Sequence, residues 1–188
     1  MSDISKRTPE EILFTYFRAK EGNRPHLMAH VFSESMTLET VVRTEAISFP
    51  SVSTGLATIT DVLVRKFAQT YENVYSFYLG RPQPGTHAEK FSCDWLVGMS
   101  AKEGGSVRVG CGRYDWRFLS RQPCLADRLV ITIEAMEVLS PESLDPVLGW
   151  LTGLPYLWCS AEAALETAPD IGGLAPIFGH VARGAKRA

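Results

Sequence analysis

The chain has 188 residues, of which 45% are hydrophobic and 21% are charged. This composition is ordinary for a folded globular protein and argues against global disorder, and the length favours a single domain. The formal net charge is −2. Because there is no excess of basic residues to bind a phosphate backbone, no nucleic-acid partner is expected.

The first residues are polar and lack the apolar core of a signal peptide. No stretch approaches the roughly 20 apolar residues that a membrane-spanning helix needs. The four cysteines form no CxxC pair, which favours reduced thiols buried as small apolar side chains. We therefore expect a cytoplasmic protein without a membrane partner.

Metal binding is not expected. His26 and His30 are four residues apart on a helical segment, which is a spacing that can place two ligands on one face. However, no glutamate completes an HExxH motif and no third ligand is near in the sequence. Phosphate-binding and dinucleotide-binding glycine motifs are also missing from the sequence, so no cofactor is expected.

The N-terminal part of the chain has helical signals. Thr8 followed by Pro9 and Glu11 is typical of a capped helix start, and Gly22 predicts the end of this first helix. A second, short helix follows. A third begins after Gly55, where apolar residues recur every four positions.

Alternating apolar residues indicate strands in the rest of the chain. One strand is expected between the second and third helices and four more follow, at residues 36–43, 74–79, 91–99, 107–119 and 129–139. Tight loops between consecutive strands favour an antiparallel meander. The expected fold class is therefore α+β, with three N-terminal helices packed on a curved antiparallel sheet that encloses one pocket, as in a cone.

The C-terminal part falls outside this pattern. We expect one domain over residues 8–168, with a helical extension at 140–168 and a flexible, Gly- and Ala-rich tail at 169–188. The extension is too apolar to remain in water. We expect it to cover the mouth of the cone with Trp150 or Trp158 as a lid; the outer face of the sheet and a partner subunit are the alternatives.

The order of these elements resembles the NTF2-like superfamily, which includes SnoaL-like and ketosteroid isomerase-like proteins. The resemblance covers residues 8–139. It rests on four short segments, Gly22-Asn23, Val31-Phe32-Ser33-Glu34, Gly55 with Ile59, and Tyr114-Asp115-Trp116-Arg117-Phe118. The resemblance implies a cone with one pocket. Members of the superfamily include isomerases, dehydratases, polyketide cyclases, epoxide hydrolases and non-catalytic proteins, so the fold does not determine the function.

The resemblance also suggests pocket residues. Ketosteroid isomerase-like members place a carboxylate base near the end of the first strand, where this chain has Thr40. Strand alternation turns the neighbouring Glu39 to the opposite face, so steroid-isomerase chemistry is in doubt. Tyr16 and Tyr114 lie near the positions of the two hydrogen-bond donors that stabilise an oxyanion in such enzymes.

Three further residues are candidates for acid–base chemistry. Asp94 and Asp115 lie within strands, and burial of either carboxyl group would raise its pKa. The alternative is that both face outward and pair with a strand arginine. His87 lies near a strand start, either at the mouth of the pocket or in an exposed loop.

Two functions remain open. The first is a cofactor-free isomerase, dehydratase or cyclase that acts on a small hydrophobic ring or polyketide-like molecule. The second is a non-catalytic ligand-binding or dimerisation module, and a homodimer through the outer sheet faces is expected. The candidate catalytic residues are Tyr16, His87, Asp94 and Asp115. The candidate ligand-binding residues are Thr40, Trp95, Tyr114, Trp116, Phe118 and Trp150.

Overall fold

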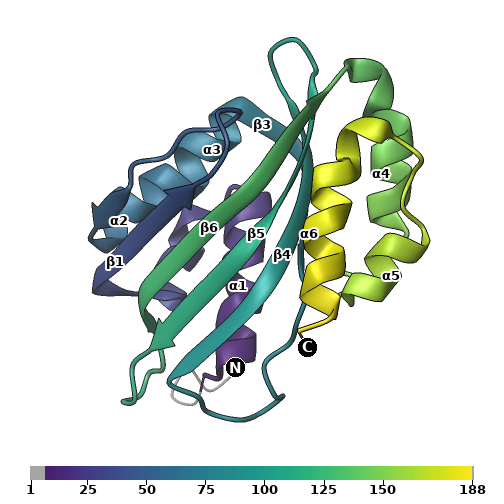
Figure 1. Cartoon of the computed structure of the whole chain (residues 1–188). Helices are drawn as coiled ribbons and strands as arrows, with labels where there is room; N and C mark the ends of the chain where they lie inside the picture. The colour runs from purple at the N-terminus through teal and green to yellow at the C-terminus, as the bar shows by residue number, and fades with distance from the viewer. Residues whose placement is uncertain (1–6, 188) are drawn as a thin grey trace.

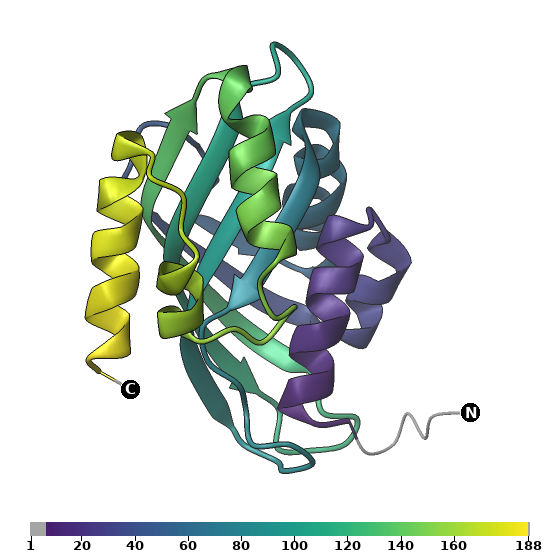
Figure 2. The same cartoon turned by 90° about the vertical axis from the view of Figure 1, so that its right-hand side faces the viewer.

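The computed structural model describes residues 7–187 and shows a curved six-stranded sheet with helices on both faces (Figures 1 and 2). The strand order is β2-β1-β6-β5-β4-β3. The strands are β1 (Phe32–Val42), β2 (Val52–Thr54), β3 (Tyr71–Tyr78), β4 (Lys90–Ala101), β5 (Val107–Phe118) and β6 (Ala126–Leu139). The predicted α+β class and curved sheet are thus confirmed.

The sheet is mixed rather than wholly antiparallel. Strands β3 to β6 form the predicted antiparallel meander, but β1 lies parallel to β6, with Thr40 opposite Ile131. A parallel pair needs a long connection, and here three helical segments and the four strands β2 to β5 separate β1 from β6 in the chain. The expectation of a purely antiparallel sheet was therefore wrong at this one pairing.

The N-terminal helices cover the inner, concave face of the sheet. They are α1 (Pro9–Glu21), the 3₁₀ helix η2 (Pro25–His30), and a continuous helical segment made of α2 (Leu56–Thr60), η3 (Asp61–Arg65) and α3 (Lys66–Thr70). The capping box at the start of α1 is present, because the Glu11 carboxylate accepts from the Thr8 N–H at 2.9 Å. The apolar faces of these helices and the inner face of the sheet form the main core.

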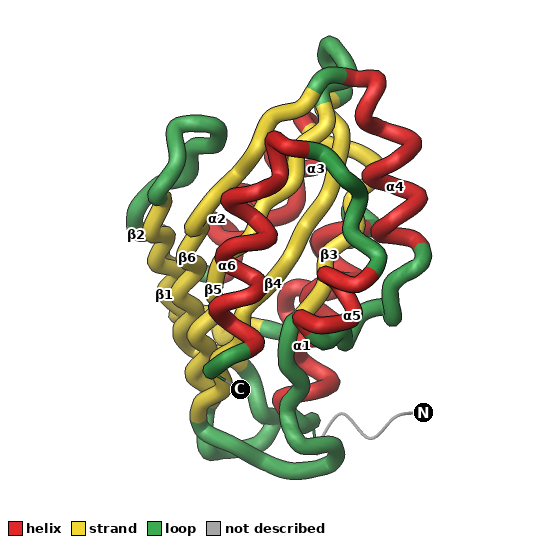
Figure 3. Tube along the Cα trace, turned by 45° about the vertical axis from the view of Figure 1, so that its right-hand side comes forward, coloured by secondary structure: helices red, strands yellow, loops and turns green. Residues whose placement is uncertain are grey.

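The C-terminal part of the chain covers the outer, convex face instead (Figure 3). Its helical segments are η4 (Pro141–Ser143), α4 (Leu144–Thr152), α5 (Ala161–Glu166), η5 (Gly172–Leu174) and α6 (Ala175–Ala185). Helix α4 packs on β4, and α6 packs on β5 and β6. These contacts form a second apolar core around Phe77, Leu96 and Val109.

Two expectations about the C-terminal part are corrected by this packing. Residues 175–185 form a helix with Ile177, His180 and Val181 buried, so most of 169–188 is not a flexible tail. The helices α4 and α5 of the extension lie on the outer face rather than over the mouth of the cone, while Leu157 joins the inner core and Trp158 stacks on Tyr78 at its edge. Gly98 of β4 allows this close packing, because a Cβ there would lie 2.1 Å from Cδ1 of Leu151.

Candidate functional site

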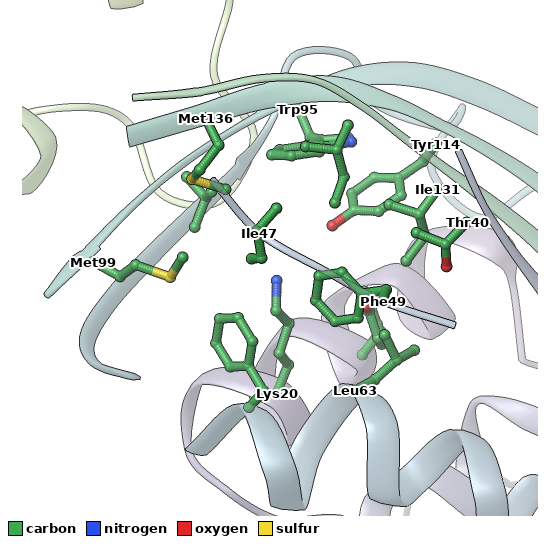
Figure 4. Close-up of a pocket in the computed structure, with 14 residues that line it drawn as sticks. Lys20, Thr40, Ile47, Phe49, Leu63, Trp95, Met99, Tyr114, Ile131 and Met136 are labelled. Carbon is green, nitrogen blue, oxygen red and sulfur yellow. The ribbon is translucent and has the colours of Figure 1, made fainter. Parts of the chain in front are cut away.

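An apolar cavity of about 40 Å³ lies between the inner face of the sheet and the N-terminal helices (Figure 4). A single enclosed water needs about 10–15 Å³, so the cavity admits a small group or a few waters without rearrangement. Its walls come from α1, β1, the β1–β2 loop, η3, α3, β4, β5 and β6. The lining residues are Tyr16, Lys20, Thr40, Ile47, Phe49, Leu63, Phe67, Trp95, Val97, Met99, Tyr114, Ile131, Ile133 and Met136.

The predicted faces of the first strand are correct at Thr40. Its side chain lines the cavity and is 7% exposed, while Glu39 turns away and its carboxylate lies 2.8 Å from the Arg128 guanidinium. Successive side chains of a strand point to opposite faces, which makes this arrangement a direct consequence of the alternation. The position that would carry a base in a ketosteroid isomerase therefore has a hydroxyl group here.

Several buried polar groups of the cavity walls have no hydrogen-bond partner among the residues that the structure describes. They are the Tyr16 hydroxyl, the Thr40 hydroxyl and the Trp95 indole N–H. Burial raises the pKa of both Tyr16 and Tyr114, whose rings meet edge-on at 6.2 Å without a hydrogen bond between the hydroxyl groups. Both phenols therefore stay protonated near neutral pH and can donate to a ligand.

Lys20 is a cavity residue that the sequence reasoning missed. Its Nζ lies 4.7 Å from the ring centroid of Phe67, and Figure 4 shows its amine and the Tyr114 hydroxyl both directed toward the space between them. Burial lowers the pKa of Lys20 to about 8, against the opposing effect of the neighbouring Glu21 charge. A signal was available in the sequence, because Lys20 follows Tyr16 by four residues and so shares its helix face.

The Glu21 carboxylate does not enter the cavity. It accepts hydrogen bonds from the Ser76 N–H and from the Tyr156 hydroxyl, both at 2.6 Å. Burial raises the pKa of Glu21, and these two donors partly offset that rise. Within residues 7–187, no carboxylate lies within 4 Å of the Lys20 amine.

The other three candidate catalytic residues lie outside the cavity, so the catalytic assignment is wrong for them and the alternatives hold: both aspartates face outward beside an arginine, and the histidine lies in an exposed loop. Asp94 is buried on the outer face, 3.1 Å from the Arg113 guanidinium and 3.8 Å from Nε2 of His180. Asp115 is on the same face, 3.5 Å from Arg113. His87 is exposed in the loop between β3 and β4. Strand alternation places both aspartates opposite their cavity-facing neighbours, so neither can act there.

Three of the predicted ligand-binding aromatics also lie elsewhere. Trp116 and Phe118 are buried on the inner face, where their rings stack at 6.0 Å, but they belong to the packed core beside the cavity. Trp150 packs on the outer face, where its indole N–H donates to the Ala164 carbonyl at 2.9 Å and its ring meets Phe178 edge-on. Trp95 and Tyr114 do line the cavity.

The β1–β2 loop supplies part of the cavity wall, a role that the sequence reasoning did not assign to it. Ile47 and Phe49 of this loop line the cavity. The Arg108 guanidinium donates to the Ala46 carbonyl and lies 5.5 Å from the ring centroid of Tyr71, which fixes the loop on the end of the sheet. The apolar residues at positions 47 and 49, within a Ser- and Thr-rich loop, were the available signal.

The thiols and potential metal ligands of residues 7–187 do not form a further site. Burial raises the pKa of each of the four thiols, which makes them poor nucleophiles: Cys93, Cys111, Cys124 and Cys159. Within the described part of the chain, no group of three or more His, Cys, Asp or Glu side chains could hold a metal ion. Across residues 7–187, no helix has the length and apolar character needed to cross a membrane.

Neither protein-family models nor curated protein sequences match this chain. Solved structures do. An NTF2-like superfamily protein from Salmonella enterica is 13% identical, with a TM-score of 0.54 over 67% of this chain and 88% of its own. A hexachlorocyclohexane dehydrochlorinase from Novosphingobium barchaimii is 11% identical, with a TM-score of 0.53 over 68% and 85%. A ketosteroid isomerase-like protein from Catenulispora acidiphila, in complex with trimethylamine, is 17% identical, with a TM-score of 0.50 over 66% and 85%. These likenesses show that the chain has the NTF2-like fold.

Proposed function

We propose that this protein binds a small, largely apolar molecule in the cavity enclosed by the sheet and the N-terminal helices. The observation that supports this most directly is the composition of the cavity wall. It combines apolar side chains with a few polar groups that lack partners within the described residues, which is the usual composition of a small-molecule site. Most buried polar groups in packed cores have partners, and the unpartnered groups that border the cavity are open to a ligand.

Ligand binding without catalysis is the better supported form of this proposal. No Asp, Glu or His is among the residues that line the cavity, so a carboxylate- or histidine-dependent isomerase, dehydratase or cyclase mechanism has no base there. One observation favours a cofactor-free enzyme as the second candidate. The pKa of Lys20 is lowered toward the working range of a general base, and the Tyr16 and Tyr114 hydroxyls could stabilise an oxyanion.

A cavity-filling substitution tests the location of the ligand. We expect Ile131→Phe, on the cavity wall, to weaken binding of toluene by about tenfold or more, since one or two methylene contacts in an apolar pocket are worth that much. NMR titration or calorimetry measures the affinity. The matched control is Val138→Phe on the same strand, where the side chain is 50% exposed. The proposal fails if toluene does not bind, or if both folded variants bind it equally.

The homodimer remains a proposal, and the packing limits where its interface can be. The chain's own α4 and α6 cover β4, β5 and part of β6, so a dimer formed through the outer face of the sheet would use the remaining surface around β1, where Val41 is 42% exposed. We expect light scattering at micromolar concentration to give twice the mass of the chain. A monomer mass would contradict the proposal.

A further inference from the structure

Lys20 places a positive charge at the end of an apolar cavity without a counterion. Its amine has no carboxylate within 4 Å in the described chain, and its near neighbour is the face of the Phe67 ring. Burying a charge is costly unless it is paired or hydrogen-bonded. Glu21 acts on the amine only from a distance, so an anionic ligand would supply the contact partner that the described residues do not give it.

The polar groups around Lys20 are chiefly donors. An ammonium group and an indole N–H can only donate, and a protonated phenol donates readily. Lys20, Trp95 and Tyr114 provide these three kinds of group in the cavity wall, while no carboxylate, imidazole or side-chain amide lines it. The group that fits such a wall is an acceptor, and beside an ammonium the best acceptor is an anion.

Lys20 also lies where the cavity meets the surface. Lys20 and Phe67 line both the inner cavity and a depression between the end of α1, α3 and the start of β3. A ligand that enters from this depression passes the amine first. The apolar part of the ligand would then contact the inner walls, and the charged end of the ligand would stay near water.

We propose that Lys20 makes the cavity selective for small apolar carboxylates, such as a benzoate-sized ring acid, with the carboxylate at the amine and the ring against the inner walls. This inference rests on the proposed ligand-binding function and adds the chemical class of the ligand. The cavity as it stands admits only a small group, so a single ring enters only when its wall moves, and the loop residues Ile47 and Phe49 are the part of the wall outside the sheet and helices.

The pH dependence follows from the charge on Lys20. Burial lowers the pKa of Lys20 to about 8, so the amine is charged below that pH and neutral above it. Affinity for a carboxylate is therefore constant at pH 6 to 7 and falls as the pH rises through about 8. The other charged or titratable groups near Lys20 are Tyr16, Glu21, Tyr71, Glu72, Lys102 and Tyr114.

Three probes of one shape and different charge test the proposal by calorimetry on the full chain. At pH 6.5 we expect benzoate to bind about tenfold or more tightly than neutral benzamide, and cationic benzamidine to bind least. Lys20→Met should abolish the preference and its pH dependence, whereas Lys20→Arg should retain the preference at pH 9. The control is Lys102→Met in the same depression, whose amine donates to the Ala68 carbonyl at 2.7 Å.

The outcomes separate this inference from the proposed function. Equal affinity for benzoate and benzamide, or a benzoate preference that survives Lys20→Met, would overturn the role of Lys20 and leave ligand binding in place. If none of the three probes binds and toluene also fails to bind, then the proposed function itself is wrong. A preference that depends on Lys20 and weakens above pH 8 supports the proposal.

Discussion

Trp150→Ala is expected to lower the free energy of unfolding by about 3–5 kcal/mol and to leave ligand affinity unchanged. The Trp150 side chain is 5% exposed and packs in the outer core, edge-on to Phe178 at 5.7 Å. Its removal leaves a cavity and deprives the buried Ala164 carbonyl of a donor. The inner cavity lies on the other face of the sheet, which is why binding should not respond.

Urea unfolding and toluene titration of the same variant check both parts of this expectation. Thr152→Ala on the same helix is the matched control, because Thr152 is exposed and its loss should cost less than about 0.5 kcal/mol. A clear loss of toluene affinity in Trp150→Ala at temperatures where the protein is folded would show that this residue acts at the cavity after all. A loss of stability no larger than that of the control would show that the outer helices are not firmly packed.

The N-terminal helices and the inner face of the sheet were the more predictable part of the molecule. Alternation in β1 placed Thr40 inside and Glu39 outside, and the capping sequence at Thr8 placed the start of α1. Both features depend on a local rule: side chains alternate along a strand, and a helix start needs acceptors for its free N–H groups. Local rules can be read from a single sequence.

The outer half depends on which segments meet in space. Strand β4 is buried on both faces from Cys93 onward, so its apolar residues could not show what covers the second face. For Asp94 the sequence left a base in the pocket and an outward ion pair with a strand arginine both open, and the strand pairing that brings Arg113 beside it decides for the ion pair. The apolar character of residues 140–160 predicted burial and not its location.

Lys20 shows the same limit within the candidate site. A lysine near the end of a helix is ordinarily a solvated surface residue, and the four-residue spacing from Tyr16 is the one feature of the sequence that places Lys20 on the inner face. Its importance comes from the cavity that forms above it, from Phe67 across the opening and from the orientation of Glu21 toward Ser76. Sequence spacing could place it beside Tyr16 but could not indicate that its charge lacks a counterion.

Gly112→Ala is expected to be among the most damaging single-methyl substitutions, with a loss of about 3 kcal/mol or more in the free energy of unfolding. Gly112 lies in β5 where the register with β6 shifts, and a Cβ there would lie 1.9 Å from the Thr132 carbonyl oxygen and 2.7 Å from Cζ2 of Trp95. The first contact is with backbone and cannot be relieved without disturbing the ladder. The second contact displaces a cavity-lining ring, so toluene affinity should fall in whatever fraction stays folded.

Gly149→Ala in α4 is the control, because a Cβ at Gly149 meets nothing within 4 Å and replacing a helical glycine should stabilise the protein by about 0.5–1 kcal/mol. Urea unfolding of both variants decides the matter. If the free energies of unfolding of the two variants agree within about 0.5 kcal/mol, then β5 does not pack against β6 at this bulge in the way that the structure shows.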